Sequence, residues 1–311
     1  MEFKHISVLL DECLEGLDIK PDGVYCDGTA GGAGHSREIA KRLDADKGGR
    51  LIAIDRDPEA VAVATERLAG YPAQVVRGNY SEIDEIFGRL GIKGADGILL
   101  DLGVSSYQLD NGARGFSYHA DAPLDMRMSG EGLSARDVVN GYDYQALAKI
   151  IFEYGEEKFA RSIAQKIVKA REEKPIETTL ELAEIIKSAV PQKARREKNP
   201  CKKTFQAIRI EVNAELEHLS RALDKAFDAL NVGGRLCIIT FHSLEDRLVK
   251  QRFQSFCRGC VCPPDFPVCI CGQTPRGRLV NRKPIEAGEA ELAVNNRSRS
   301  AKLRIIEKIK D

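Results

Sequence analysis

The chain has 311 residues with 47 basic and 47 acidic side chains, so its formal net charge is zero. A hydrophobic content of 43% and a charged content of 30% are typical of globular proteins and exclude wholesale disorder. They also exclude a small, uniformly basic nucleic-acid-binding module, so a nucleic-acid partner would require a local basic patch.

The sequence carries no signal for export or for membrane insertion. Charged residues interrupt the first twelve positions, where a signal peptide needs an apolar stretch. The longest apolar runs, such as residues 98–100 and 237–239, are too short to span a bilayer. Nine cysteines are an odd number without a secretory context, which argues against a disulfide framework. We expect a soluble, cytoplasmic protein with no membrane partner.

Strand and helix patterns alternate in the first third of the chain. Four short apolar runs predict buried strands, at residues 24–27, 50–55, 74–76 and 97–101. Between them, Asp57 followed by Pro58 predicts one helix start, and Ser81 predicts another as part of a capping box. This order predicts an α/β fold with a doubly wound, mostly parallel sheet covered by helices on both faces.

The alternation stops after residue 110. Residues 111–132 are rich in glycine, residues 134–187 show only helical patterns, one of them capped by Thr179, and a basic loop at 191–203 follows. We therefore predict a small helical domain inserted at 111–203, with a role in substrate recognition. The predicted core consists of residues 1–110 and 204–311.

The sheet pattern resumes after the insertion. Apolar residues from Ile208 to Leu230 recur at spacings of three and four, which predicts one long helix ending before Gly233-Gly234. Further strands are predicted at 235–241 and 301–307, the last of them pairing with 291–294.

The sharpest candidate site is a glycine-rich loop between the first strand and the first helix of this pattern. Its sequence is Asp27-Gly28-Thr29-Ala30-Gly31-Gly32-Ala33-Gly34-His35. Such a loop lets a ligand approach the backbone closely and presents N–H groups to an anion. Asp55, at the end of the second strand, is placed to accept hydrogen bonds from ribose hydroxyls. Together they indicate a site for a nucleoside cofactor.

Two classes of cofactor compete for this loop. The dinucleotide fingerprint G-x-G-x-x-G/A fails at Arg37, which argues against a nicotinamide-dependent oxidoreductase. The loop is more similar to that of the S-adenosylmethionine-dependent methyltransferases. A third hypothesis, a non-catalytic RNA-binding or assembly factor, is disfavoured because Asp55, Asp101 and the glycine loop are all intact.

Long motifs then extend one resemblance over nearly the whole chain. They are His5-x-x-Val8-Leu9-Leu10, the loop from Asp27 to Ser36, Ala53 to Asp57, Leu100 to Ser106, Arg114 to Ser117, Pro123 to Met128, Thr204 to Ala207 and Phe241 to Arg247. With these motifs, the chain resembles the RsmH/MraW family, the bacterial methyltransferases that form N4-methylcytidine in small-subunit ribosomal RNA.

The resemblance implies a class I methyltransferase core of Rossmann-like fold, interrupted by a helical domain, with S-adenosyl-L-methionine as cofactor. The cofactor contacts that it implies are Ala33, Gly34, His35, Asp55, Tyr80, Asp101 and Gln108. The implied substrate is the N4 amino group of a specific cytidine in small-subunit ribosomal RNA, within the assembled or assembling 30S subunit. Whether the enzyme is a homodimer stays open.

Catalytic residues are expected at the ends of the fourth and fifth strands. Conjugation with the ring makes the exocyclic amine of cytosine a poor nucleophile, so the site must align amine, methyl and sulfur and accept hydrogen bonds from the amine. We predict that Asp101 or Ser105 orients the amine and that His242 and Asp246 line the base pocket. After Asp101 the chain lacks the Pro-Pro-aromatic sequence of many amino-methyltransferases, so base stacking is expected from Phe241, Phe116 or Tyr107.

Basic residues concentrate near the fifth strand. Residues 193–203 hold six basic side chains against one acidic, and residues 247–283 hold eight against one. We predict that these stretches bind the RNA backbone, together with Arg297, Arg299, Lys302 and Arg304.

Five cysteines form a separate candidate site within 15 residues, namely Cys257, Cys260, Cys262, Cys269 and Cys271. Two short cysteine pairs joined by a proline-rich loop can hold a structural zinc ion through thiolates. The Cys-x-Cys spacing is less typical of zinc sites than Cys-x-x-Cys, so a reduced, thiol-rich loop is the alternative.

Overall fold

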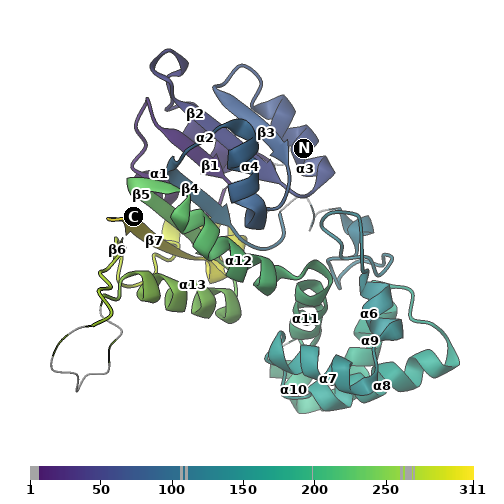
Figure 1. Ribbon diagram of the computed structural model, residues 1–311. Helices are drawn as coiled ribbons and strands as arrows, with labels where there is room; N and C mark the ends of the chain where they lie inside the picture. The colour runs from purple at the N-terminus through teal and green to yellow at the C-terminus, as the bar shows by residue number, and fades with distance from the viewer. Residues whose placement is uncertain are drawn as a thin grey trace. The chain divides into compact units, whose positions relative to one another are not determined.

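The computed structural model describes residues 7–105, 108, 111–197, 199–259, 262, 268 and 270–311. The chain divides into two compact units, the first formed by Met1–Gly103 with Leu216–Asp311 and the second by Val104–Glu215 (Figure 1). The second unit extends beyond the predicted insertion at 111–203 at both ends. At its C-terminal end the extension consists of helix α11 (Cys201–Asn213).

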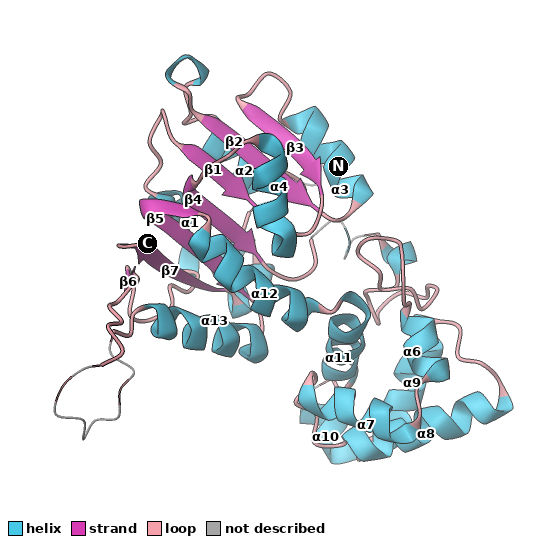
Figure 2. Ribbon diagram, viewed as in Figure 1, coloured by secondary structure: helices cyan, strands magenta, loops and turns pink. Residues whose placement is uncertain are grey.

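A seven-stranded sheet forms the centre of the first unit (Figure 2). Its order is β3-β2-β1-β4-β5-β7-β6, and the strands from β3 to β5 are parallel whereas β7 runs antiparallel to β5 and β6. The bounds are β1 Val24–Asp27, β2 Arg50–Asp55, β3 Ala73–Arg77, β4 Ala95–Asp101, β5 Leu230–Thr240, β6 Gly277–Leu279 and β7 Lys302–Lys308. The predicted doubly wound, mostly parallel sheet is confirmed.

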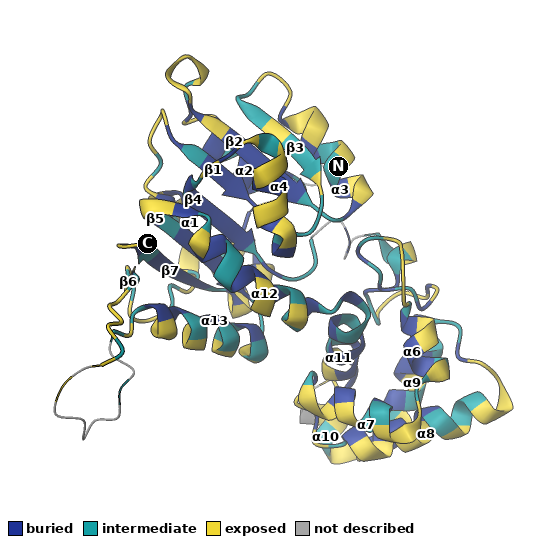
Figure 3. Cartoon of the chain, viewed as in Figure 1, coloured by how far each residue is buried: buried dark blue, intermediate teal, exposed yellow. Residues whose placement is uncertain are grey.

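Helices cover both faces of this sheet because side chains alternate along each strand. On β4, Ile98 and Leu100 belong to the core beneath α4 (Ile83–Leu90), α12 (Glu215–Asp228) and α13 (Ser243–Phe256). Leu99, between them, belongs to the opposite core with α1 (Leu10–Leu17), α2 (Gly34–Ala40) and α3 (Pro58–Arg67). Figure 3 shows the central strands β1, β2 and β4 as mostly buried, whereas the edge strand β3 is intermediate or exposed.

The last strand does not pair as predicted. Glu289–Val294 forms a short helix, α14, so its expected pairing with the strand at 302–308 is wrong. β7 instead adds to β5, and the three-residue β6 adds to β7. A short apolar run cannot by itself distinguish a strand from a helix, which is the reason for this error.

The second unit is helical, as predicted. Its helices are α6 Ala135–Gly141, α7 Tyr144–Glu153, α8 Ala160–Glu173, α9 Thr179–Ala189, α10 Gln192–Glu197 and α11. They enclose an apolar core of their own, to which Leu147, Ile163 and Ile186 contribute fully buried side chains. The cap of α9 is Thr178 and not Thr179, because the Thr179 hydroxyl donates to the carbonyl of Ala120.

The predicted long helix between Ile208 and Leu230 is two helices. The helix is interrupted at Ala214, between α11 and α12, because the backbone of this residue is left-handed with φ 48°. Ile208 packs in the core of the second unit, whereas Leu219, Leu223 and Phe227 pack in the core of the first. One continuous apolar stripe in the sequence therefore serves two separate cores.

The helix start near residue 81 also differs in detail. Asn79 and Glu82 form the capping box, which opens a short 3-10 turn at Tyr80–Glu82 immediately before α4. The side chain of Ser81 instead lies 3.0 Å from Nδ1 of His218. Among the described helices, none is both long enough and apolar enough to cross a membrane.

Candidate active site

The reversal of strand order places a ligand site at the carboxyl ends of β1 and β4. β1 lies between β2 and β4, and in open α/β sheets ligands bind where the strand order reverses in this way. The glycine loop leaves β1 at this edge and is held by backbone hydrogen bonds on both sides. Gly28 N donates to the carbonyl of Leu99 on β4, and Ala30 N donates to that of Ile54 on β2, each at 2.9 Å.

Asp27 fixes the shape of the loop from within. Its carboxylate accepts a 3.0 Å hydrogen bond from Thr29 N and a 2.6 Å hydrogen bond from the hydroxyl of Ser36 in α2. Asp27 is 1% exposed, so these bonds join the end of β1 to α2 inside the protein. The loop then reaches α2 through Ala33, whose backbone is left-handed with φ 59°.

Gly28 is needed for space. A Cβ atom at this position would lie 2.5 Å from Cδ2 of Leu100 and 3.0 Å from Cβ of Tyr80. The same contact shows that Tyr80, which follows β3, lies against the glycine loop. Local sequence carried no signal for this placement, because a lone aromatic residue after a strand is most simply read as packing.

Asp55 ends β2 and contacts the loop directly. Its Oδ2 accepts a 2.7 Å hydrogen bond from Gly31 N, and its Oδ1 accepts one of 2.8 Å from Asp57 N. Burial raises the pKa of Asp55 to about 6, although both backbone donors oppose this rise. Each carboxylate oxygen has a second lone pair, so Asp55 can still accept hydrogen bonds from two hydroxyl groups.

Asp101 ends β4 beside the loop. Its backbone N donates a 2.7 Å hydrogen bond to the hydroxyl of Thr29, and its Oδ2 lies 3.7 Å from Nδ1 of His35. Oδ1 is enclosed and has no hydrogen-bond partner in the part of the chain that is described. Burial raises the pKa of Asp101 to about 6, and the His35 ring works against this rise.

The first unit thus brings together six of the seven residues predicted to contact the cofactor, namely Ala33, Gly34, His35, Asp55, Tyr80 and Asp101, at one edge of the sheet. The seventh, Gln108, belongs to the second unit, where it is 5% exposed. There its Oε1 accepts from Ser105 N at 3.0 Å, and its backbone N donates to the Ser105 hydroxyl at 3.2 Å.

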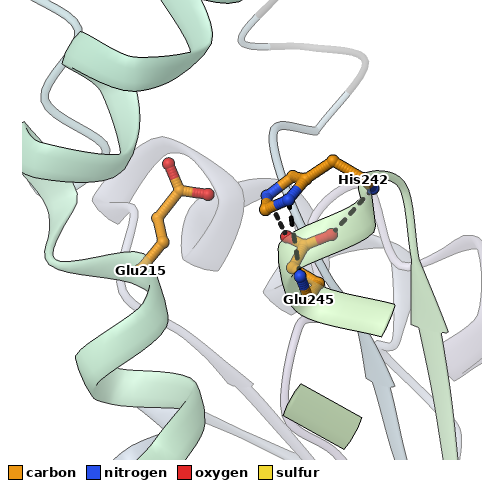
Figure 4. A group of neighbouring side chains, drawn as sticks. All are labelled: Glu215, His242 and Glu245. Atoms are coloured by element: carbon orange, nitrogen blue, oxygen red, sulfur yellow. Dashed lines mark hydrogen bonds and ion pairs between the residues drawn. The ribbon is translucent and has the colours of Figure 1, made fainter. Parts of the chain in front are cut away.

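His242 has a structural role at the start of α13 (Figure 4). It is the N-cap of this helix, and its Nδ1 accepts from Glu245 N at 3.4 Å. Glu245 Oε2 accepts in return from the backbone N atoms of Phe241 and His242, at 2.8 and 3.3 Å. Its Oε1 lies 3.1 Å from Nε2 of His242, within ion-pair range. Local sequence does not single out Glu245, because the usual capping box begins with Ser or Thr whereas this one begins with His242.

Asp246 is engaged by a residue that was expected to bind RNA. Arg304 on β7 donates from Nε and Nη2 to the two carboxylate oxygens of Asp246, at 2.7 and 3.1 Å. Arg304 is only 9% exposed and its guanidinium is paired, which argues against the predicted contact with RNA. Of the three predicted stacking residues, Phe116 is buried in the core of the second unit, Tyr107 lies outside the described residues and Phe241 is half-buried.

The predicted zinc ligands are described in part. Cys257, Cys262 and Cys271 are described, whereas Cys260 and Cys269 are not. Burial raises the pKa of Cys257, which favours its thiol over the thiolate. Within the described residues, no cysteine belongs to a group of three ligand atoms lying within 4.8 Å of one another.

Fold and site together define a class I methyltransferase that uses S-adenosylmethionine. The residues fit this cofactor: the glycine loop lets it approach the backbone, Asp55 can accept from its ribose, and the Asp101 carboxylate, with its unpartnered Oδ1, suits its positive charge.

Comparison with known proteins identifies the family. The model of the MraW methylase family matches residues 2–309, and the chain belongs to this family. Proteins named ribosomal RNA small subunit methyltransferase H are 56% identical to it in Lachnospira eligens, over 99% of both chains, and 56% identical in Clostridium botulinum, over 99% of this chain and 100% of the relative. A protein of Agathobacter rectalis named ribosomal RNA small subunit methyltransferase H 2 is 58% identical over 99% of both.

Solved structures resemble the chain more distantly. An rRNA methylase from Streptococcus thermophilus has a TM-score of 0.44 and 10% sequence identity, covering 98% of this chain and 99% of that one. A likeness at this level adds nothing to the family assignment.

Proposed function

We propose that the protein transfers a methyl group from S-adenosylmethionine to the N4 amino group of a specific cytidine in small-subunit ribosomal RNA. The observation that carries this proposal is the family match over residues 2–309, in a chain whose Asp55, Asp101 and glycine loop form one intact cluster. The relatives at 55–58% identity are named as methyltransferases of small-subunit ribosomal RNA.

When bound, the cofactor supplies a methyl group that is already electrophilic because it is carried on a sulfonium. The task of the chain is therefore to orient the amine of cytosine. An ionised Asp101 accepts a hydrogen bond from this amine and so favours localisation of its lone pair. With a pKa of about 6, this carboxyl group is mostly ionised at neutral pH. Ser105 is the alternative residue for this role, and His242 and Asp246 support the base pocket through the start of α13.

The second unit is proposed to recognise the RNA. Its exposed side chains Lys193, Arg196 and Lys202 lie in the basic stretch 193–203. Of the residues in the other basic stretch, Arg278 donates to Glu307 at 2.8 Å and Arg282 is exposed. A target cytosine has to be unstacked to reach the site, and basic residues that hold the flanking backbone would stabilise that state.

Two finer points belong to the same proposal: the enzyme acts in the cytoplasm, and its substrate is the assembled or assembling 30S subunit. The cysteine cluster at 257–271 is either a structural zinc site or a reduced, thiol-rich loop, and the raised pKa of the Cys257 thiol favours the loop. Methylation assays on free ribosomal RNA and on 30S subunits test the substrate. Sedimentation analysis tests whether the enzyme is a homodimer. Metal analysis of protein purified without chelator tests for zinc, and less than a few tenths of an ion per chain rejects it.

Nucleoside mass analysis tests the central proposal. Ribosomal RNA from a strain lacking this protein should lose one N4-methylcytidine, which the wild-type chain restores and Asp101→Ala does not. Unchanged nucleosides in the deletion strain would reject the proposal. Calorimetry with S-adenosylmethionine and with NAD separates the methyltransferase from an oxidoreductase, because only the first ligand should bind.

A further inference from the structure

The side chain of His35 is held inside the first unit in a defined orientation. The residue lies in α2, is 7% exposed, and its Nε2 lies 3.0 Å from the carbonyl oxygen of Val8. A carbonyl oxygen can only accept a hydrogen bond, so Nε2 must carry a hydrogen. In the neutral imidazole, Nδ1 then has a free lone pair.

This bare nitrogen faces a carboxylate. Nδ1 of His35 lies 3.7 Å from Oδ2 of Asp101, and both atoms are acceptors when the ring is neutral and the carboxyl group is ionised. At 3.7 Å the two atoms are within ion-pair range but beyond hydrogen-bond range. The ring therefore acts on the carboxylate through its charge.

We propose that His35 is a positioning residue for Asp101, and that its ring, 3.7 Å from Oδ2, keeps the carboxylate ionised and oriented in the active site. The proposal extends the proposed function, since it concerns the residue assigned to orient the amine. It goes beyond the cofactor contact that was expected of His35, because here the ring acts through Asp101.

The surrounding charges explain why Asp101 needs such a partner. Asp27 on β1 and Glu245 on α13 both raise the pKa of Asp101, in addition to its burial, and His35 is the group that lowers it. Cys13, on α1, has a thiol that is buried and whose pKa is raised well above its ordinary value, so it stays neutral and adds no negative charge. His242 lies 3.1 Å from Glu245 and opposes that acid, whereas among the groups that act on Asp101 itself His35 is the one that lowers its pKa.

Two variants of His35 separate its contacts. In His35→Gln the amide can reach the position of Nε2 and keep the bond to Val8, but nothing replaces Nδ1. In His35→Asn the amide can reach the position of Nδ1 and donate to Asp101, but the bond to Val8 is lost. If His35 matters only as an anchor for Val8, the glutamine variant should behave like the wild type. If it acts on Asp101, the asparagine variant should be the milder change.

Binding of S-adenosylmethionine, measured by calorimetry between pH 5 and pH 8.5 on the full chain, tests the proposal. Wild-type affinity should fall as the pH drops through about 6, where Asp101 and Asp55 both become protonated, and the Asp101→Asn variant isolates the contribution of Asp101. Because His35 lowers the pKa of Asp101, His35→Gln should move this fall upward by about one pH unit, and His35→Asn by less. In an Asp101→Asn background, His35→Gln should cause no further shift.

The proposal would be overturned if His35→Gln left the pH at which affinity falls unchanged. It would also be overturned if His35→Gln still moved this pH in the Asp101→Asn background. Melting temperatures at pH 8 confirm that each variant is folded. The tautomer can be observed directly by ¹⁵N NMR of labelled histidines, since the chain has five and His35→Gln identifies one signal. A hydrogen on Nδ1 instead of Nε2 in the neutral ring also contradicts it. Neither readout requires RNA, so a failure here is distinguishable from a failure of the proposed function.

Discussion

Replacing Arg304 of β7 is expected to destabilise the first unit, because its guanidinium is paired with Asp246 of α13. The sequence places it in a basic strand suited to RNA, whereas the structure pairs it with Asp246 across the edge of α13. Replacing it by methionine keeps the apolar part of the side chain within β7 and removes the charge. Asp246 would then lose the two hydrogen bonds that the guanidinium of Arg304 donates to it.

The expected cost follows from burial. Breaking a fully buried ion pair costs about 3–5 kcal/mol. Here the side chains of Arg304 and Asp246 are 11% and 16% exposed, and Lys302 Nζ lies 3.9 Å from Asp246, so part of the charge stays compensated. We therefore expect Arg304→Met to lower the free energy of unfolding by about 2–3 kcal/mol. This corresponds to a decrease of about 1 M in the urea midpoint.

Urea unfolding followed by circular dichroism measures this change, with Arg299→Met as the matched control. Arg299 is exposed, so its replacement should alter stability by less than about 0.5 kcal/mol. The double variant Arg304→Met with Asp246→Leu should recover much of the loss, because no unpaired charge remains. If Arg304→Met unfolds at the wild-type midpoint but loses RNA affinity, Arg304 is an RNA contact and the reasoning from the ion pair is refuted.

Three further changes are predicted from the structure. Gly28→Ala should lower the free energy of unfolding by about 1–3 kcal/mol, measured in urea, and weaken cofactor binding, because its Cβ would displace Tyr80. If the variant bound the cofactor with full affinity, the predicted displacement of Tyr80 would be wrong. Asp55→Asn should weaken S-adenosylmethionine binding by about 10- to 100-fold in calorimetry, as expected for loss of a charged acceptor. Since the pKa of Asp55 is raised to about 6 in the fold, the wild type loses stability from this group as the pH rises from about 4 to about 6, and Asp55→Asn should lack that loss. Ala214→Gly should stabilise the protein by up to about 1 kcal/mol in urea unfolding, because glycine adopts the left-handed backbone at φ 48° without strain; a destabilised variant would show that Ala214 is held by packing.

Much of the cofactor site follows from local sequence. Apolar runs of strand length predicted β1, β2 and β4, and the polar residues that follow them had to share one edge because parallel strands end on the same side. Asp55 and Asp101 were found in this way. Tyr80 and Gln108 were not, and they entered through the family resemblance, because neither has a local pattern that distinguishes binding from packing.

Other features required the tertiary structure. The apolar stripe from Ile208 to Leu230 is periodic along its whole length, and periodicity does not state which core a helix face enters, so the break at Ala214 was invisible. The roles of Arg304 and His35 were hidden for a related reason. Their partners, Asp246 and Asp101, are 58 and 66 positions away. Only the packing of β7 against α13, and of α2 against β1 next to β4, brings the charges together.

The sequence by itself thus determined the order of strands and helices, the glycine loop and the acidic strand ends, because these depend on residues close together in the chain. The tertiary structure alone decided which charges are exposed and which are paired, because burial and electrostatic contacts depend on neighbours that are distant in sequence. In this methyltransferase, the tertiary structure buries Arg304, which the sequence suggested as an RNA contact, and it places His35 beside Asp101.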